Sequence, residues 1–586
     1  MDIHKNWFTY TYLTIFCIFM GYSLFSGILN IGSSTEFPFL WYGGILLLMG
    51  ALWLSANTFA YGMSHLDLKG FYHKNRILSG MLEGFIVFSV LLAGTLLRVW
   101  VINNFPMLPS SDFKTYFDIA ALLSKGTLLT EGAGFCDYIS QFPHVFGFPC
   151  VLSAVFRLFG ISVKAGLYLN LTASLISVVL AYLIARAVCG KTGGYIALML
   201  TAFWPSQILY INQLASEYVF TCLFLLSVLI VVYLLKVPVE SGKISKMLFL
   251  NVSLGISLAL AGAVRPMSII LLIAVIICIL PYGLKKSRAP GAGFARKAVS
   301  RGWVHVLIIF ACYAISSQAI TASVSKIIDR ELPGSTVSFG YNLMVGVNIS
   351  SKGAWNEEDA GFFNGKFLET GSSSEAHKAS IGVALSRIKE NPVGVANLAL
   401  EKYALLWKND DYAADWNRLF LGQQNNLTPE RNGLINRLVP WNNVYYLICV
   451  FFSFMAGILL WNRNRAGSEH ILILFFIGTA LLHMLLENQN RYHFNVLPVF
   501  AILAAVGLTR IIGHYAEKAS IPAMEPAAGY WQETAEINHK ISGKEDGKPP
   551  ENHRFDIIKA IKEGHVIVTV TEEYKKDAEK NSNGEG

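Results

Sequence analysis

The sequence predicts an all-α polytopic membrane protein, and three observations support this class. Of its 586 residues, 53% are hydrophobic and only 15% are charged, whereas about a quarter of the residues in soluble domains are charged. Apolar stretches long enough to cross a bilayer, about 20 residues, recur along most of the chain. The basic residues are concentrated in particular loops. The net charge of +8 therefore indicates membrane topology and not a nucleic-acid-binding surface.

The apolar stretches predict about twelve transmembrane helices. They lie near residues 9–30, 38–61, 80–102, 164–188, 192–210, 214–236, 246–264, 266–284, 303–323, 441–461, 469–487 and 493–513. A further candidate, 144–160, is short, contains Pro149 and has Arg157 near its end. No small-residue cleavage site closes the first stretch convincingly, so we expect a retained helix there and not a signal peptide.

The distribution of Lys and Arg decides whether segment 144–160 crosses the membrane. The basic loops contain Lys69, Lys74 and Arg76; Arg186 and Lys191; Lys236, Lys243 and Lys246; Lys285 to Arg301; and Arg463 and Arg465. If 144–160 crossed, the first two of these loops would lie on opposite faces of the membrane. If it lies along the surface, all of them fall on the cytoplasmic side together with both termini. We therefore expect the second arrangement.

This topology divides the chain into distinct parts. A pair of N-terminal transmembrane helices and a cytoplasmic loop occupy 1–79, and a transmembrane core that includes a first outer loop, 103–163, occupies 80–324. An extracytoplasmic region follows at 325–440, then C-terminal transmembrane helices at 441–513 and a polar cytoplasmic tail at 514–586. No internal repeat is visible in the sequence.

The stretch SSDFKTYFDIA, Ser110 to Ala120, begins an amphipathic helix just after the apolar run that ends near residue 102. Asp112 and Tyr116 are four residues apart and therefore share one face of that helix. One interpretation is that Ser110, Ser111 or Asp112 caps the helix, since these residue types satisfy free backbone amides at helix starts. The other is that Asp112 has a function at the outer surface.

Acids and arginines are both predicted at the outer ends of the helices. They are Asp112, Glu217, Glu487, Arg98, Arg265 and Arg491. Glu217 is also explained as a first-turn acid that the helix dipole favours, but an outer arginine calls for an anionic partner. Acids alone would indicate cation binding, and arginines alone would indicate lipid headgroups. The mixture suits an enzyme that binds a phosphorylated lipid and performs acid–base chemistry with a carboxylate.

The order of several motifs resembles that of a known group of proteins. An Asp early in the first outer loop is followed by an interfacial helix, and then by FPHVFGFP, LFG, WPSQILY with SEYVF, VRP, and RYHFNVLPVFAILAA. This order, from about residue 80 to 513, resembles the GT-C superfamily of membrane glycosyltransferases. The similar branch is the family-39-like one, with protein-O-mannosyltransferases and lipid A aminoarabinose transferases, in its bacterial form. The resemblance implies the GT-C fold, with interfacial jaw helices and a mostly helical extracytoplasmic region.

The resemblance also implies an activity. Such enzymes invert the anomeric centre while moving a sugar from a polyprenyl-phosphate carrier to an acceptor, here a cell-envelope glycan, lipid or protein at the outer face of the cell membrane. Asp112 would be the general base, and Glu217 would orient the acceptor or pair with an arginine. The implied donor phosphate contacts are Arg265, Arg491, Arg98 and His144, and the implied acceptor or lipid contacts are Tyr116 and Tyr492. His144 stands where the lipid A branch has a lysine, and packing explains it equally well.

Other readings of the sequence remain open. A transporter or flippase of lipid-linked sugars is the main alternative, although transporters usually show internal repeats and ionisable residues near the midplane. A catalytically inactive scaffold is a third. No cofactor is evident. The segment NDDYAAD, Asn409 to Asp415, is the nearest approach to a metal-binding pattern and is read as a solvated turn, with a divalent cation left as an alternative. Whether Cys136 and Cys150 form a disulfide is also left open.

Overall fold

The computed structural model describes residues 3–4, 7–33, 44, 47, 49–51, 54, 76–236, 244–281, 301–333, 337–463 and 465–520. Most of the expected helix 38–61, much of three basic loops and the tail beyond Ser520 lie outside these residues. The described part is helical except for strands β1 (Ile3–His4) and β2 (Arg465–Ala466), which pair antiparallel. The all-α membrane fold class is therefore confirmed.

Within the described residues, 8 helices are long and apolar enough to cross a membrane. They are α1 (Trp7–Ser33), α4 (Arg76–Asn104), α9 (Val163–Ala202), α11 (Glu217–Lys236), α12 (Ile244–Val264), α15 (Gly302–Ile328), α21 (Pro429–Trp461) and the run of η4 (Asn490–Val496) into α23 (Leu497–Ser520). Two further apolar helices, α13 (Ser268–Ile279) and α22 (His470–Leu485), are shorter. The chain is thus a multi-pass membrane protein.

Helix α9 accounts for part of the difference from the expected number of spans. Its 40 residues comprise two helices that meet at a kink, and they contain the predicted stretch 164–188 and the first part of 192–210. A straight helix of that length would measure about 60 Å, about twice the hydrocarbon thickness of a bilayer. The backbone is not helical at Cys189 and Gly190, where φ is −131° and 86°. The break falls in the basic segment where the sequence predicted a loop between two spans.

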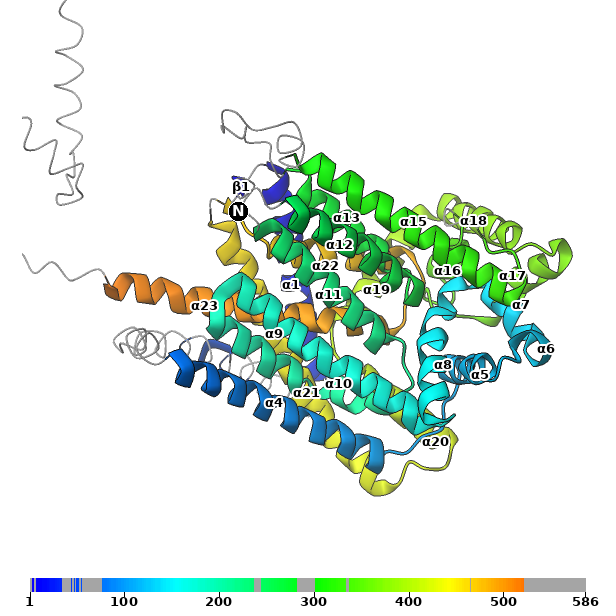
Figure 1. Cartoon of the computed structure of the whole chain (residues 1–586), viewed down its shortest axis with the longest axis horizontal. Coiled ribbons are helices and arrows are strands. Elements are labelled where there is room, and N and C mark those ends of the chain that lie inside the picture. The colour runs from blue at the N-terminus through cyan, green and yellow to red at the C-terminus, as the bar shows by residue number, and fades with distance from the viewer. Residues whose placement is uncertain are drawn as a thin grey trace, which may run out of the picture. The chain divides into compact units, whose positions relative to one another are not determined.

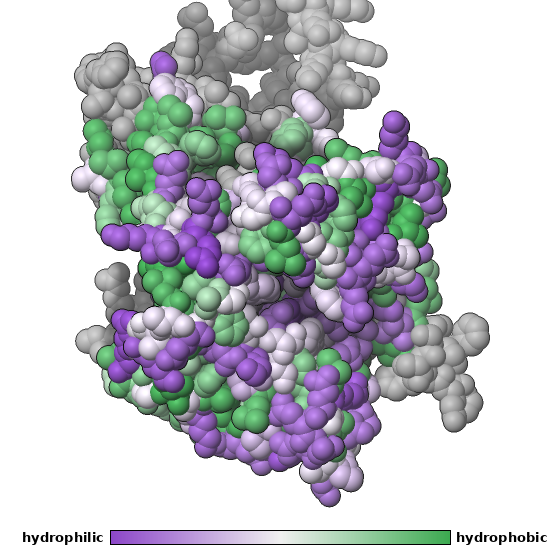
Figure 2. All heavy atoms as spheres, turned by 90° about the vertical axis from the view of Figure 1, so that its right-hand side faces the viewer, coloured by the Kyte–Doolittle hydropathy of each residue, from purple (hydrophilic) through white to green (hydrophobic). Residues whose placement is uncertain are grey.

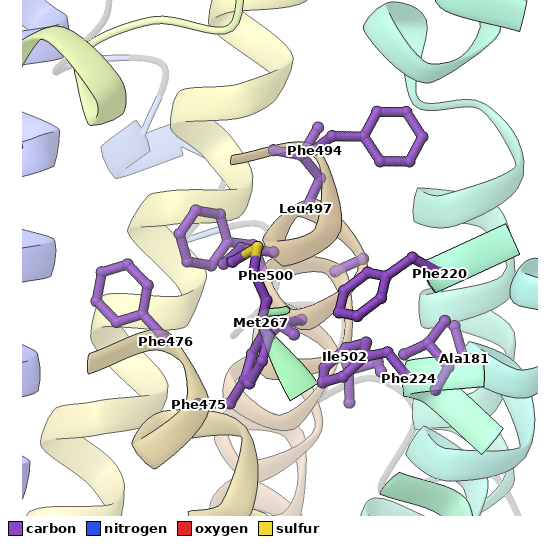
Figure 3. Close-up of a cluster of buried hydrophobic side chains, with 14 of the residues drawn as sticks. Ala181, Phe220, Phe224, Met267, Phe475, Phe476, Phe494, Leu497, Phe500 and Ile502 are labelled. Carbon is purple, nitrogen blue, oxygen red and sulfur yellow. The ribbon is translucent and has the colours of Figure 1, made fainter. Parts of the chain in front are cut away.

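The membrane helices pack around an aromatic-rich core (Figure 3). Helix α11 packs against α9 and α12, α12 against α15, and α1 against α21. Phe500 of α23 lies near Phe476 of α22, with ring centroids 5.3 Å apart, and Phe224 of α11 stacks on Phe475 at 4.2 Å. Figure 3 shows Phe494, Leu497, Phe500 and Ile502 of the η4–α23 segment beside the phenylalanines of α11 and α22. This packing fixes the position of η4, which carries Arg491.

The two ends of the helix bundle differ in chemistry. At one end β1 pairs with β2, Glu83 bonds to Arg186 and Lys191, and Glu469 bonds to Arg510. These basic residues belong to, or lie close to, the loops that the sequence predicts to be cytoplasmic.

The opposite end is built from short helices (Figure 1). They are α5 (Asp112–Lys125), α6 (Leu128–Glu131), α7 (Ala133–Gln141), η1 (Pro143–Val145), α8 (Gly147–Phe159), α10 (Pro205–Leu209), η2 (Tyr210–Asn212), α16 (Gly340–Gly346), α17 (Glu357–Thr370), α18 (Ser373–Glu390), α19 (Pro392–Trp407) and α20 (Tyr412–Gln423). They come from the two regions that the sequence predicts to be extracytoplasmic and from the proline-broken segment after α9.

Segment 144–160 forms the end of η1 and the helix α8. The segments Ala133–Gln141 and Pro143–Phe159 meet at 120°. Helix α8 has 13 residues, fewer than the about 20 that a straight crossing requires. It packs against α5, α9 and α12. At its start a Cβ on Gly147 would lie 2.1 Å from the backbone oxygen of Ala263, so only glycine permits this contact with α12.

Candidate active site

Helix α5 begins directly at Asp112. The preceding residue, Ser111, has φ 51° and ψ −134°, and its side chain makes no capping hydrogen bond. Ser111 therefore occupies the N-cap position without capping the helix through its side chain. A left-handed φ costs a residue with a Cβ about 1–3 kcal/mol, and such strain is often found at functional sites. The backbone of Ser111 thus sets the position of Asp112 at the start of α5.

An alternating chain of acids and arginines starts at Asp112. Its carboxylate accepts a hydrogen bond from Arg491 Nη2, and Arg491 Nε lies 3.8 Å from Glu217 Oε1. The same Glu217 oxygen lies 2.8 Å from Arg265 Nη1. Asp112 comes from α5, Arg491 from η4, Glu217 from the start of α11, and Arg265 from the α12–α13 junction. The fold therefore joins four residues that the sequence proposed separately.

Solvent exposure separates the roles of the two carboxylates. The exposed fraction of the side chain is 40% for Asp112, 13% for Arg265, 6% for Arg491 and 1% for Glu217. A substrate can therefore reach Asp112, whereas Glu217 is enclosed and faces the two arginines. A buried charge is tolerated only when it is paired. Glu217 thus keeps the arginines in place, which matches the arginine-pairing role considered for it.

Aromatic rings hold the arginine side chains. The guanidinium carbon of Arg491 lies 4.6 Å from the ring centroid of Trp416 and 5.2 Å from that of Phe113. The guanidinium carbon of Arg265 lies 5.6 Å from the ring centroid of Tyr492. Such contacts fix the plane of a guanidinium group and favour its charged form. Tyr492 was among the sequence candidates, whereas Trp416 was not.

Tyr116 and His144 lie close to these charges. Burial, and then the Asp112 carboxylate, raise the pKa of the Tyr116 phenol to about 12. Burial, and then the Arg265 guanidinium, lower the pKa of His144 to about 4. Near neutral pH both side chains are therefore uncharged and can act only through hydrogen bonds. His144 brings no positive charge to an anion, unlike the lysine that the lipid A branch has in its place.

Arg98 lies apart from this cluster. It is fully buried between α4 and α9. Its guanidinium donates to Ser174 Oγ at 3.0 Å and to the backbone oxygens of Gly94 and Ala202 at 3.0 and 2.8 Å. These bonds hold helices together. Arg98 does not contact Asp112 or Glu217. We therefore do not assign it to the proposed phosphate site.

Asp410 was not among the candidate residues. The segment NDDYAAD was expected to be a solvated turn, and this expectation is wrong, because Asp410 is fully buried. Its carboxylate accepts hydrogen bonds from Trp204 Nε1 at 2.8 Å and Ser206 Oγ at 2.6 Å, and its other oxygen lies 2.8 Å from His493 Nε2. The donors belong to the WPS and RYHF motifs. The polar side chains of these motifs were the signal in the sequence for a buried acceptor.

Asp410 positions the arginine that faces Asp112. His493 is two residues after Arg491 in η4, and the contact with Asp410 anchors that turn. Trp204 and Ser206 lie at the start of α10, after the break that follows α9. One buried carboxylate therefore joins α10, η4 and the connection between α19 and α20.

The sequence did not decide whether the chain binds a metal ion or whether Cys136 and Cys150 form a disulfide. No group of three or more His, Cys, Asp and Glu side chains is arranged to hold a metal ion in the part of the chain that the structure describes. Cys136 and Cys150 are both free thiols.

The cluster lies at the end of the molecule that Figure 2 faces. This face is hollowed near its centre, and hydrophilic residues lie within the hollow. Asp112, the exposed member of the acid–arginine chain, belongs to α5, one of the helices at this end (Figure 1).

No protein-family model and no curated protein sequence matches the chain. Among solved structures, it is similar to the Archaeoglobus fulgidus oligosaccharyltransferase in complex with Zn and sulfate, with 13% identity, a TM-score of 0.39, and 75% of this chain and 52% of that chain covered. It is also similar to the archaeal oligosaccharyltransferase AglB from the same organism, in complex with an inhibitory peptide and a dolichol-phosphate, with 12% identity, a TM-score of 0.39, and coverage of 84% and 59%. The chain thus spans little more than half the length of these two proteins.

A third similar structure is ArnT from Cupriavidus metallidurans bound to undecaprenyl phosphate, with 13% identity, a TM-score of 0.29, and 80% of this chain and 81% of that chain covered. These similarities concern the fold, and the roles of individual residues rest on the geometry described above. The oligosaccharyltransferases and ArnT are GT-C superfamily membrane glycosyltransferases, the group that the order of motifs in this sequence resembles.

Proposed function

We propose that the chain is an inverting glycosyltransferase that moves a sugar from a polyprenyl-phosphate carrier to a hydroxyl group of a cell-envelope acceptor at the extracytoplasmic face. The observation that carries this proposal is the chain Asp112–Arg491–Glu217–Arg265 at one end of a bundle of apolar helices. It combines one accessible carboxylate with two enclosed arginines. A transfer from a lipid phosphate to a hydroxyl requires both of these groups.

The arginines suit the phosphate of the donor. Arginine binds phosphate through charge-assisted hydrogen bonds, and a fixed cation stabilises the negative charge that develops on a leaving phosphate. A sugar phosphodiester carries one negative charge, as the Asp112 carboxylate does. When the phosphodiester takes the place of Asp112 beside Arg491, the charge around the arginines is unchanged. Glu217 stays with both guanidinium groups throughout.

Asp112 suits the role of general base. Once Arg491 holds the phosphate, the carboxylate is free to accept the proton of an acceptor hydroxyl. The oxygen of that hydroxyl forms a bond to the anomeric carbon while the bond from this carbon to the phosphate oxygen breaks. The product sugar has the inverted configuration, the polyprenyl phosphate leaves with the electron pair, and the proton remains on Asp112. In this proposal Tyr116, which shares the face of Asp112, holds the acceptor by a hydrogen bond.

The geometry favours this reaction over transport. The arginines and carboxylates of the proposed site gather at one end of the bundle, whereas transporters bind their substrates near the middle of the membrane. We therefore keep the transferase as the proposed function and the flippase as the alternative that the transfer assay tests.

Removal of either arginine is expected to weaken donor binding. Arg265→Ala and Arg491→Ala should each raise the KM for the polyprenyl-phosphate sugar by about 10- to 100-fold, because a hydrogen bond to a charged group contributes about 1.5–3 kcal/mol. Transfer kinetics in membranes measure this change. The control is Arg330→Ala, since Arg330 pairs with Asp137 on the surface and its side chain is 41% exposed. An unchanged donor KM would exclude the phosphate role of the arginine concerned.

The proposed topology can be tested separately from catalysis. In a background without native cysteines, Asp112→Cys should react with a membrane-impermeant maleimide in intact cells. Arg463→Cys, at the end of the bundle that carries the basic loops, should react only after permeabilisation. Labelling in the opposite order would place Asp112 in the cytoplasm and overturn the extracytoplasmic site.

A further inference from the structure

An open pocket of about 390 Å³ lies next to α5. Its lining residues are Thr115, Glu131, Gly132, Gly134, Phe135 and Tyr138, from α5, α6 and α7. The volume falls in the range of small-molecule sites, about 300–1,000 Å³. Neither Glu131 nor Tyr138 has a role in the acid–arginine chain described above. The acid–arginine chain therefore leaves this pocket without a role.

The pocket adjoins the accessible carboxylate. Thr115 is three residues after Asp112 in α5, so the two side chains are neighbours on one face of the helix. Burial, and then the Asp112 carboxylate, raise the pKa of the Tyr138 phenol. A ligand in the pocket can therefore extend a group to Asp112.

The wall of the pocket is firmly held. Cys136 and Ile139, on the inner face of α7, pack with Val324 and Ile328 of α15. At the end of α7, Ser140 Oγ lies 3.3 Å from Ser373 Oγ, and the backbone oxygen of Gln141 lies 2.9 Å from His377 Nε2. The pocket is thus preformed, which reduces the entropy lost when a ligand binds.

The lining residues select the chemistry of the ligand. None of them is Lys, Arg or His, so the pocket offers no cation to a phosphate or an acidic peptide. Phe135 and Tyr138 are three residues apart and share one face of α7. The negative faces of aromatic rings attract the weakly positive C–H groups on the flat side of a pyranose ring. Thr115 and Glu131 supply polar oxygens that can bind sugar hydroxyl groups.

Peptides and lipids fit this pocket less well. The lining segments are mainly helical, and helices satisfy their own amides and offer no strand edge to which an extended peptide can add. The pocket also lacks an apolar groove for an acyl chain, since only Phe135 and Tyr138 provide large apolar surfaces. Gly134 keeps one side open, because a Cβ there would have no atom within 4 Å.

We propose that this pocket is the acceptor subsite and that it binds a sugar residue of a glycan without phosphate, whose free hydroxyl meets Asp112. The pyranose ring packs against Phe135 and Tyr138, and its other hydroxyl groups bond to Glu131 and Thr115. The inference deepens the proposed function and rests on it for the transfer step. The binding of a sugar in the pocket does not depend on transfer.

Binding is tested with the purified full chain in detergent. Saturation-transfer difference NMR would be recorded with maltose, cellobiose, α1→6-mannobiose and N,N′-diacetylchitobiose. At least one disaccharide should bind saturably, and Tyr138→Ala and Glu131→Gln should each weaken it by about tenfold. The control Leu129→Ala changes an exposed residue of α6 that does not line the pocket and should bind normally. If no disaccharide binds, or if both pocket variants bind as the wild type does, the subsite is overturned.

Transfer is tested in membranes with labelled polyprenyl-phosphate sugars and separated glycan, peptide and lipid fractions of the envelope. The label should appear in the glycan fraction, and Tyr138→Ala should raise the KM for this acceptor without raising that for the donor. Label in the peptide or lipid fraction would overturn the subsite and leave the transferase standing. If the wild type binds a disaccharide but labels no fraction, the proposed function fails and the sugar-binding pocket stands.

Discussion

Asp112→Asn is expected to slow sugar transfer by about 10²–10⁴-fold, because an amide cannot accept the proton of the attacking hydroxyl. The substitution keeps the size of the side chain and its hydrogen bond from Arg491, so insertion and folding should be preserved. Single-turnover transfer with saturating donor measures the chemical step. Thermal denaturation of the solubilised protein verifies that it is folded.

The matched control for this prediction lies on the same helix. Asp118 forms an ion pair with Lys114 on α5, and Asp118→Asn removes a carboxylate without touching Arg491. It should retain close to wild-type activity, since exposed ion pairs contribute only about 0–1 kcal/mol. Near wild-type transfer by Asp112→Asn would exclude Asp112 as the base.

Asp410→Ala is expected to have the largest effect on stability. It leaves Trp204 Nε1, Ser206 Oγ and His493 Nε2 without their partner in a buried site. Each buried group that loses its partner costs about 1–3 kcal/mol, and the whole stability of a folded protein is typically about 5–15 kcal/mol. We expect little folded protein in the membrane and a large fall in Tm, measured by thermal denaturation in detergent.

Two further variants test whether the loss of stability comes from the Asp410 carboxylate itself or would follow any substitution in this segment. Asp410→Asn keeps an acceptor oxygen and should be milder, because the Ser206 hydroxyl or the His493 ring can adjust which atom donates. Asp415→Ala, whose side chain is 52% exposed, should change Tm little. A normal Tm for Asp410→Ala would show that the buried contacts do not hold η4 in place.

Much of the architecture could be predicted because the bilayer imposes a simple rule on sequence. An apolar run of sufficient length becomes a helix, and the break at Cys189–Gly190 falls where basic residues marked a loop. Asp112, Glu217, Arg265 and Arg491 could be proposed because the basic loops predict that they lie at the outer helix ends, and because the resemblance to the GT-C superfamily implies roles for them there. The pairing among them depends on α5, α11 and η4 meeting in space, which no local pattern encodes.

The residues that were missed lack a local signal. Asp410 stands in a run of polar residues typical of a solvated turn, and its burial depends on donors about 200 residues earlier and about 80 residues later in the chain. In the sequence, Trp416 has the pattern of an ordinary apolar residue of an amphipathic helix. Its contact with the Arg491 guanidinium group is apparent only in the structure. Besides α5, the pocket is lined by α6 and α7, whose 4 and 9 residues are too few to give a clear hydrophobic period.

The contact between Arg491 and Asp112 has a kinetic consequence under the proposed function. While the guanidinium group holds the carboxylate, the base is occupied, and an acceptor that arrives first meets a site that cannot deprotonate it. Arrival of the carrier phosphate releases the base. Deprotonation of the acceptor should therefore begin only after the carrier lipid has bound, so a glycan that already occupies its pocket waits there without reacting.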